Sequence, residues 1–534
     1  MQVSSILNEF LNVSIALSRE KNTSQLLEHI LLSAKKLSHA DGGTIYSLND
    51  NKELVFDTLY NDTLNMHIGG SSSTAIEFSP IPIYIDGEIN MSSAVSHSAA
   101  TGQLINIDDL YEDSQYSTSR AKDIDKRYNY RTQSVLTVPM KNHENEINGV
   151  LQLINATDSD GNTVPFSDDV VRSVEALASL ASVALTNRQL IDAMEELFQA
   201  FTRLIAKAID EKSPYTGGHC RRVPELTMMI AEAVHRHDEG PLASFTMSDA
   251  DRKELDLAGW IHDCGKVATP EYVMDKSKKL ETVFDRIELV KTRFELAKRD
   301  AEIAALKAQL SASNDAERDA IQTQLDSQLE QLSKACDFVE KANTGGESMH
   351  EDDQMQLVTI SELASVTVGG ETTPLLTEEE IYNLKTARGT LNPEERQIIN
   401  RHMDITVEML EALPFPKHLR RVPEFAGGHH EKMDGTGYPK GLTRDQMSLP
   451  ARMMAIADIF EALTAADRPY KDAKKVSECL RIMGFMCRDD HIDPDLFEIF
   501  VKQRVYWQYA EQFCKPEQMD DLPIEKIPGL EHCA

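Results

Sequence analysis

The sequence lacks the features of a membrane-spanning or disulfide-stabilised protein. No run of roughly eighteen apolar residues, the length that a helix needs to cross a bilayer, occurs in it, so we expect no membrane insertion. Its seven cysteines are scattered without Cys-x-x-Cys spacing, which argues against a disulfide framework and fits a reducing compartment. We therefore expect a cytoplasmic protein.

Positive charge is also scarce. The 534 residues include 87 Asp and Glu but only 55 Lys and Arg, which gives a net charge of −32. Long-range repulsion at this charge argues against binding to nucleic-acid polymers or anionic membranes. A small anionic substrate remains compatible where cations, including metal ions, gather locally. The length predicts roughly two to four domains, and the composition is that of a globular protein.

The first domain is predicted over residues 1–190. Residues 1–20 have the pattern of an amphipathic helix, because Glu9 interrupts their apolar positions. The sequence then alternates helical and strand patterns, with Asn, Asp and Gly at the turns. We expect an α+β domain with an antiparallel sheet and flanking helices; the helix covers 26–40 and the strands cover 42–50, 53–60, 134–142 and 147–156.

A long connecting helix is predicted over residues 167–212. Apolar residues recur there at intervals near three and four, although Asn187 interrupts the series. This spacing is typical of a helix that pairs with its own copy, so we expect a homodimer formed through this helix. The alternative is a helix that packs on its own domain.

The second domain, residues 200–534, has an almost entirely helical pattern and is expected to be an all-α bundle. Residues 277–391 interrupt it with a different composition. Two charged, Ala- and Gln-rich helical segments separated by Ser-Ala-Ser-Asn-Asp predict an inserted helical hairpin, followed by a connector rich in Gly, Thr and acidic residues. This insertion could cap an active site, mediate dimerisation, dock a partner or be a tolerated surface excursion.

Five histidines and two aspartates stand out in the helical half: His219, His262, Asp263, His402, His429, His430 and Asp458. Each has a structural alternative, because a single histidine on an apolar stripe is usually a hydrogen-bonded core residue and a buried aspartate is usually paired. Together, however, two carboxylates buried among apolar helices cost several kcal/mol unless a cation compensates them.

The residue types indicate which ions would fit. Imidazole and carboxylate without thiolate suit iron, manganese or zinc rather than calcium or magnesium. Adjacent His-Asp and His-His pairs could face two neighbouring ions, and such a pair of ions activates a water molecule and clamps a phosphoryl group. We therefore expect two divalent metal ions and phosphoester hydrolysis.

The same segments resemble a known family. "HDCGK" is similar to the signature of HD-domain phosphohydrolases, and "HHEKMDGTGYP" followed by "IADIFEALTAADRPYK" is similar to the HD-GYP subfamily, over residues 200–276 and 392–475. The resemblance implies a bacterial cyclic di-GMP phosphodiesterase with a di- or trinuclear metal centre, usually of iron or manganese, with zinc, nickel and cobalt also compatible. It also implies that all seven histidines and aspartates are metal ligands.

The resemblance further implies roles around the metals. Lys266 matches the motif lysine that contacts the scissile phosphate, so Asp263 and Lys266 are the expected catalytic residues. Asp263 would help to hold the attacking water, and Lys266 would neutralise developing charge. The expected substrate-binding residues besides Lys266 are Gly437, Tyr438, Pro439, Arg468 and Lys471, with Tyr438 and Pro439 forming a wall and the two cations holding phosphate.

Two departures from the family pattern matter. Trinuclear members carry a glutamate one helical turn before the first histidine, whereas this chain has Tyr215 there. We therefore expect a dinuclear centre and linear pGpG as the main product, with GMP after a further cut. Cys264 replaces the usual aliphatic residue and is expected to be a packing residue.

Residues 20–190 resemble a GAF domain, chiefly through "TQSVLTVPMKN" and "INGVLQLINATDSDGNTVPFSDD". Of the residues found in cyclic-nucleotide-binding GAF domains, Asn155 and Phe166 remain, but Ala156 replaces the lysine, and Val170 and Val171 replace an acidic pair. The ligand of this domain is therefore unknown. The leading hypothesis is a phosphodiesterase regulated by the GAF domain. The alternatives are a catalytically silent cyclic di-GMP receptor that signals through its insertion, and a hydrolase of another cyclic dinucleotide such as cyclic GMP-AMP.

Overall fold

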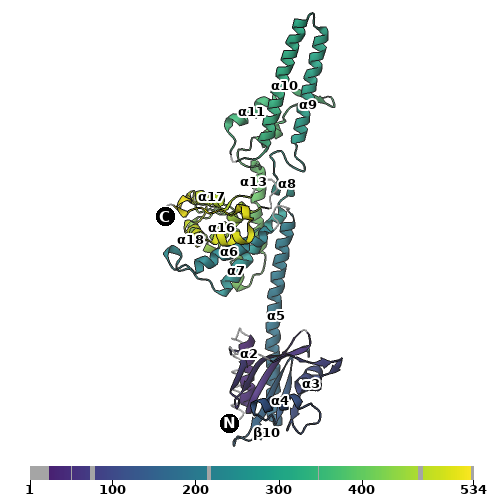
Figure 1. The fold of residues 1–534 in the computed structure, drawn as a ribbon, viewed down its shortest axis with the longest axis vertical. Helices are drawn as coiled ribbons and strands as arrows, with labels where there is room; N and C mark the ends of the chain where they lie inside the picture. Colours follow the sequence, from purple (N-terminus) through teal and green to yellow (C-terminus); the bar gives the residue numbers. More distant parts are fainter. Residues whose placement is uncertain are drawn as a thin grey trace. The chain divides into compact units, whose positions relative to one another are not determined.

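The structure is a computed structural model that describes residues 23–49, 51–72, 78–212, 218–346, 348–466 and 473–530. The chain divides into two compact units, Met1–Leu197 and Phe198–Ala534 (Figure 1). The helix predicted over residues 1–20 lies outside the described residues, as do Tyr215, Arg468 and Lys471. Among the described helices, none is both long and apolar enough to cross a membrane.

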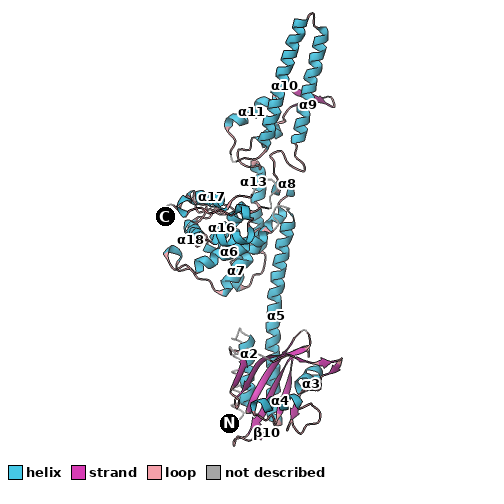
Figure 2. Ribbon diagram, in the orientation of Figure 1, coloured by secondary structure: helices cyan, strands magenta, loops and turns pink. Residues whose placement is uncertain are grey.

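The first unit is built on an antiparallel sheet, as the strand patterns predicted (Figure 2). Its main path runs in the order β3-β2-β1-β9-β8-β7. Ile45 lies opposite Leu151 where the two central strands pair, so alternate apolar residues face the same side. The strands of this path are β1 (Ala40–Leu48), β2 (Glu53–Asn61), β3 (Met66–Gly69), β7 (Ile105–Ile107), β8 (Val135–Lys141) and β9 (Ile147–Thr157).

Helices complete the first unit. Apolar residues of α2 (Thr23–Ser38) and of the first turns of α5 (Asp168–Lys212) form one core with the sheet, in which Ile30, Leu136 and Leu177 are fully buried. The smaller elements are β4 (Ile81–Pro82), β5 (Tyr84–Ile85), β6 (Glu88–Ile89), β10 (Thr163–Val164), α3 (Ala94–Thr101) and α4 (Ser119–Tyr128). The predicted α+β fold is confirmed for this unit.

A cavity of about 220 Å³ lies within the first unit, lined by residues of several strands and of α4. Tyr46, Phe56, Tyr116 and Gln152 are among its lining residues, so its wall is mostly aromatic and apolar with a few polar groups. Asn155, which the GAF resemblance singled out, has a structural role here. Its side-chain amide donates hydrogen bonds to the Tyr130 hydroxyl and to the carbonyl of Arg131.

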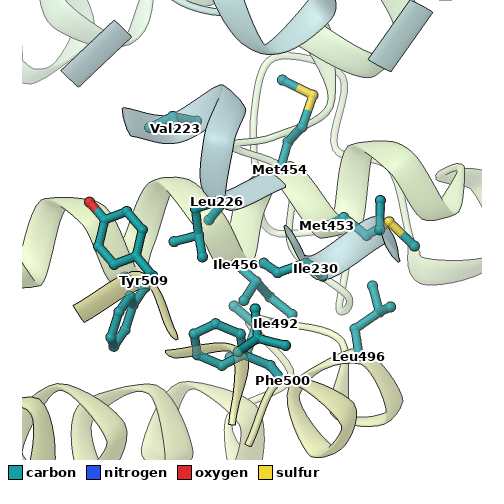
Figure 3. Packing of buried hydrophobic residues seen from close by; sticks show 14 of the residues in the cluster. Val223, Leu226, Ile230, Met453, Met454, Ile456, Ile492, Leu496, Phe500 and Tyr509 are labelled. Carbon is teal, nitrogen blue, oxygen red and sulfur yellow. The ribbon is translucent and has the colours of Figure 1, made fainter. Parts of the chain in front are cut away.

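The second unit is a helical bundle, again as predicted. Apolar residues of α6 (His219–His235) pack against α16 (Leu449–Thr464), with Leu226, Ile230 and Ile456 fully buried between them (Figure 3). The bundle also contains α7 (Asp249–Ile261), α8 (Glu271–Met274), α13 (Pro393–Asn400), α14 (His402–Glu411), α15 (Val422–Gly427), α17 (Val476–Arg488), α18 (Pro494–Lys502) and α19 (Val505–Phe513).

The insertion has a small core of its own. The predicted hairpin is formed by α9 (Ile287–Ser311) and α10 (Asp315–Asn343), and Phe294 and Val339 are fully buried at its base. The segment that we expected to be a connector is structured as well. Gly369 and Gly370 have φ angles of +62° and +91°, which allow a tight turn between two short strands. This segment contains α11 (Glu351–Ser361), β11 (Ser365–Val368), β12 (Glu371–Pro374) and α12 (Glu378–Leu384).

Candidate metal centre

The seven histidines and aspartates singled out in the sequence lie together in the second unit. They form two groups that share Asp263, and within each group one nitrogen or oxygen atom per residue lies within 4.8 Å of all the others. One group consists of His219, His262, Asp263 and Asp458, and the other consists of Asp263, His402, His429 and His430. This arrangement matches the geometry expected of two neighbouring ions, although ion binding itself remains a prediction.

The ends of helices place these residues. His219 begins α6, His402 begins α14, and His262 and Asp263 come directly after α7. A short 3₁₀ turn, Cys264–Ala268, then brings the chain against α14. Gly265 is required there, because a Cβ atom at this position would lie 2.0 Å from the carbonyl oxygen of His402. Its backbone N–H donates to the Thr406 hydroxyl at 2.9 Å, which anchors the turn to α14.

Asp263 occupies the centre of the cluster. Its Oδ2 lies 3.2 Å from Nε2 of both His219 and His262, and its Oδ1 lies 3.3 Å from Nε2 of His402. The Lys266 ammonium lies 2.5 Å from Oδ2. Burial acts to raise the pKa of Asp263, but the positive charge of Lys266 and the contact with His219 outweigh it and hold the pKa well below its usual range. Asp263 is therefore an ionised carboxylate.

Backbone hydrogen bonds fix the tautomers of three histidines. Nδ1 of His262 and of His429 each donates at 2.7 Å to the carbonyl of the residue three positions earlier, and Nδ1 of His402 does the same to Ile399. Since each Nδ1 carries the proton, each Nε2 is left as a free electron pair. Among the described residues, none is a hydrogen-bond partner of these buried Nε2 atoms or of Oδ1 of Asp263.

Unpartnered buried acceptors are costly, so a group that satisfies several of them at once is expected. A cation fits this need, because neutral imidazoles and carboxylates are the ligands that divalent transition metals prefer. Burial lowers the pKa of His429 well below its usual value and lowers the pKa of His430 to about 4. Both rings are therefore neutral at pH 7, the state that metal ligation requires.

His219 is held by a different partner, which the sequence did not single out. Its Nδ1 contacts Oε2 of Glu461 at 2.5 Å, and the other oxygen of Glu461 accepts from Arg222 at 2.7 Å. Glu461 is 1% exposed and lies three residues after Asp458 on α16, so the two carboxylates share a helix face. That spacing is the signal that could have identified it.

The loop after α15 is stabilised by one of its own acidic residues, Glu431. The Glu431 carboxylate is buried and accepts from the backbone N–H groups of Lys440 and Leu442 at 2.7 and 2.9 Å. Gly437 lies against this residue, because an added Cβ would approach the Glu431 Cα to 2.4 Å. The close folding of the loop on itself is thus one reason for a glycine here, besides the expected approach of a substrate.

Tyr438 lies beside the cluster. Its ring stacks on the His430 imidazole with a centroid separation of 4.9 Å and an interplanar angle of 22°. Pro439 follows it through a cis peptide bond. Cys264 is 3% exposed within the main apolar core, in agreement with a packing role. Of the two cations expected to hold phosphate, Arg468 and Lys471, neither belongs to the described residues.

Comparisons with known families agree with this geometry. Residues 22–185 match the model of the GAF domain, and residues 375–496 match a model of the HD domain. The chain contains a GAF domain and an HD domain. The HD match begins within the segment that we assigned to the insertion, and it includes His402, His429, His430 and Asp458.

The chain is also similar to named bacterial phosphodiesterases. The chain is 38% identical over 137 residues to 3′3′-cGAMP-specific phosphodiesterase 1 of Vibrio cholerae, which covers 26% of this chain and 30% of the relative. It is 40% identical over 114 residues to a cyclic di-GMP phosphodiesterase of Pseudomonas aeruginosa, which covers 21% and 26%. The chain thus spans less than a third of the length of these relatives. The resemblance to HD-GYP proteins is confirmed at the level of domains and relatives.

Among solved structures, the chain is similar to the GAF domain of an Acinetobacter phosphoenolpyruvate-protein phosphotransferase, with 12% identity over 35% of this chain and 98% of that domain. The TM-score is 0.27, a likeness too weak to add to the family match.

Proposed function

We propose that this chain is a metal-dependent phosphodiesterase that hydrolyses cyclic di-GMP to linear pGpG. The observation that carries the proposal is the set of buried, unpartnered Nε2 atoms of His262, His402 and His429 around the Asp263 carboxylate. No ordinary hydrogen bond explains them, and a pair of cations would. The names of the relatives, which act on cyclic di-GMP or 3′3′-cGAMP, supply the substrate class.

Two divalent ions, iron or manganese in our proposal, would be held one by each group, with Asp263 contributing to both. When bound, such ions supply Lewis-acid chemistry that polarises a phosphoryl group and makes water a better nucleophile near neutral pH. The remaining steps can be assigned to side chains of the chain itself.

Asp263 is ionised and lies between the two groups, so it is placed to orient the attacking water towards the phosphorus. Lys266 reaches the same carboxylate, and its ammonium group would neutralise the negative charge that develops on the phosphate oxygens as the 3′-oxygen leaves. Tyr438 would form an aromatic wall beside His430, together with Gly437 and Pro439. Arg468 and Lys471 remain the proposed phosphate ligands of the following loop.

Regulation by the GAF domain is part of the same proposal. A small molecule of unknown chemistry would occupy the cavity of that domain, and α5 would transmit its presence by pairing with the α5 helix of a second copy. The pairing is supported by an exposed apolar stripe whose residues are spaced alternately by four and three positions and are 54–71% exposed: Leu190, Met194, Leu197, Phe201 and Leu204.

A second candidate substrate, 3′3′-cGAMP, is favoured by the 38% identity to an enzyme specific for it. The deciding experiment is to incubate the metal-loaded protein separately with cyclic di-GMP and 3′3′-cGAMP, and to identify the products by chromatography. We expect pGpG from cyclic di-GMP. Cleavage of 3′3′-cGAMP alone would replace the substrate, and tight binding without any cleavage would favour a silent receptor.

The ligand assignment has its own test. His262→Ala combined with Asp263→Ala removes ligands from both groups, so we expect loss of metal content and of hydrolysis, measured by elemental analysis and by product formation. Retention of the full metal content in this variant would contradict the assignment.

A further inference from the structure

A pocket of the second unit lies where the insertion joins α13, the helix that leads to His402. It has a volume of about 770 Å³ and is formed by the end of α12, the following loop and α13. The residues that line it are Tyr382, Lys385, Thr386, Ala387, Arg388, Gly389, Leu391, Pro393 and Arg396. Three of them are cationic, and none of the described residues that line the pocket is acidic.

These three cations are not paired with a carboxylate in the described part of the chain. Neither Lys385, Arg388 nor Arg396 forms an ion pair with any of the described residues, whereas Arg252, Arg421 and Arg444 each bind at least one carboxylate. In a chain with 87 acidic residues and a net charge of −32, three unpaired cations lining one pocket are unexpected. Their mutual repulsion would be relieved by a bound anion.

The backbone that carries these side chains is well anchored. The N–H of Gly389, which has a φ angle of +76°, donates to the carbonyl of Gly346 at 2.9 Å. Arg396 in turn donates to the carbonyl of Arg388 at 3.4 Å. Beneath them, the Lys276 ammonium binds both oxygens of Glu395 at 2.7 and 2.8 Å. The cations are therefore presented from a fixed loop and helix rather than from a free tail.

An aromatic ring completes the pocket. Tyr382 is 46% exposed, and its hydroxyl donates to Glu394 at 2.5 Å, which holds the ring in place. Exposed aromatic rings are the surfaces on which nucleic-acid bases stack, and adjacent arginines are the usual ligands of their phosphates. The combination of ring and cations thus fits a nucleotide better than it fits an inorganic anion.

The pocket lies at the helix that leads to the cluster of histidines and aspartates. Its helix α13 ends at Asn400, and His402 begins the next helix. A nucleotide in the pocket would therefore lie at the helix that precedes His402.

We propose that this pocket binds a nucleotide phosphate, with Lys385, Arg388 and Arg396 on the phosphate and Tyr382 against the base. The nucleotide is either the second half of the cyclic dinucleotide substrate or a separate mononucleotide effector. The first possibility rests on the proposed function, whereas the second does not. In both, the insertion supplies binding groups to the catalytic unit.

The test uses the metal-loaded full chain and the variant Arg388→Gln/Arg396→Gln. The matched control is Arg299→Gln/Lys307→Gln, which removes two exposed cations of the insertion, both on α9 and neither in an ion pair with a described residue. Equilibrium dialysis with labelled GMP measures binding, and cyclic di-GMP turnover gives kcat and KM. We expect the pocket variant to bind GMP about tenfold more weakly, since charged hydrogen bonds are lost, and the control to match the wild type.

The values of kcat and KM distinguish the second half of the substrate from a separate mononucleotide effector. A rise of KM in proportion to the loss of GMP affinity, with kcat retained, identifies the pocket as the site of the substrate's second half. An unchanged KM with weakened GMP binding identifies a separate effector site. Tyr382→Leu should also weaken GMP binding, because stacking is lost.

Unchanged GMP affinity and unchanged KM in the arginine variant would overturn the proposal. Failure of the proposed function is distinguishable from this result: a wild-type protein that cleaves no cyclic dinucleotide, but binds GMP in a manner dependent on Arg388 and Arg396, would retain the pocket and lose the enzymatic activity.

Discussion

Lys266 is the residue whose role in chemistry can be separated from a role in holding metal. Its ammonium contacts Asp263 but is not a possible ligand while it is protonated, and burial, which acts to lower its pKa, is outweighed by the two aspartates that raise it. Lys266→Met should therefore leave the metal content intact and lower kcat by about 100-fold or more, the usual cost of removing one group that stabilises transition-state charge. Single-turnover kinetics with elemental analysis would measure both.

Lys307→Met is the matched control, because Lys307 is exposed on α9 of the insertion and away from the cluster elements. Its kcat should equal that of the wild type. If Lys266→Met lost its metal together with its activity, Lys266 would have to be regarded as a support of Asp263 rather than as a catalytic residue.

Glu461 is expected to act through His219. Replacing it with glutamine removes the negative charge that both His219 and Arg222 contact, and partners of this kind typically change metal affinity by 10–100-fold. Glu461→Gln should accordingly weaken metal binding by about that factor in a competition titration with a chelator. Glu408→Gln, at an exposed position of α14, should not change it. Equal metal affinity in the two variants would remove Glu461 from the site.

Residue types allowed the sequence to nominate the seven clustered residues, since paired histidines and buried aspartates in apolar helices are unusual. The same reasoning missed Glu461, because a glutamate on a helix normally faces solvent and its burial follows only from the packing of α16 on α6. The close contact of Gly437 with Glu431, a reason for glycine besides the expected approach of a substrate, is likewise visible only in the folded loop.

At the scale of elements, the turn after α7 depends on the absence of one side chain. A Cβ atom at Gly265 would meet the carbonyl oxygen of His402 and the backbone nitrogen of Thr406, at 2.0 and 2.6 Å, and neither belongs to a flexible side chain. Gly265→Ala should therefore push α14 away from the turn, destabilise the bundle by about 1–3 kcal/mol and loosen metal binding. Denaturant unfolding followed by circular dichroism measures the first effect.

Gly346→Ala is a suitable comparison, because an added Cβ there would contact nothing closer than an oxygen atom at 3.9 Å. Its unfolding midpoint should stay close to that of the wild type. A Gly265→Ala protein with an unchanged midpoint and full metal content would show that the contact between the Cys264–Ala268 turn and α14 is more adaptable than the structure indicates.

Elements with clear periodicity were predictable, and those that depend on distant contacts were not. The strands at 53–60 and 147–156 and the helix at 167–212 follow from two-residue and three-to-four-residue spacing, and they are found as β2, β9 and α5. The hairpin of β11 and β12 was not predicted, because a Gly-Gly pair such as Gly369 and Gly370 occurs in loops of many kinds and does not by itself indicate a turn between strands. Val366 of this hairpin is buried in one core with residues of α9, a helix far earlier in the chain, so local sequence could not predict its burial.

At the scale of the whole molecule, the cluster of histidines and aspartates joins residues from His219 to Asp458, and Asp263 belongs to both of its groups. Helical spacing alone could not predict that these helix ends converge, since it fixes faces and not partners. The motif resemblance supplied that convergence in advance. In our proposal, a signal in the GAF domain would reach the cluster through α5, whose exposed apolar stripe would pair with that of a second copy.

The pairing of α5 makes a prediction that involves the complete chain. Met194 and Phe201 are seven residues apart, 71% and 57% exposed, and in the same position of a seven-residue repeat. Met194→Glu/Phe201→Glu would place four carboxylates in the interface of a parallel pair, where they would be desolvated and would repel one another. We expect the dimer dissociation constant to rise by about 100-fold or more, measured by analytical ultracentrifugation. Gln199→Glu, on the outer side of the repeat, should leave it unchanged. A wild-type chain that is monomeric at micromolar concentration, or a double variant that dimerises as well as the control, would exclude α5 as the dimer interface.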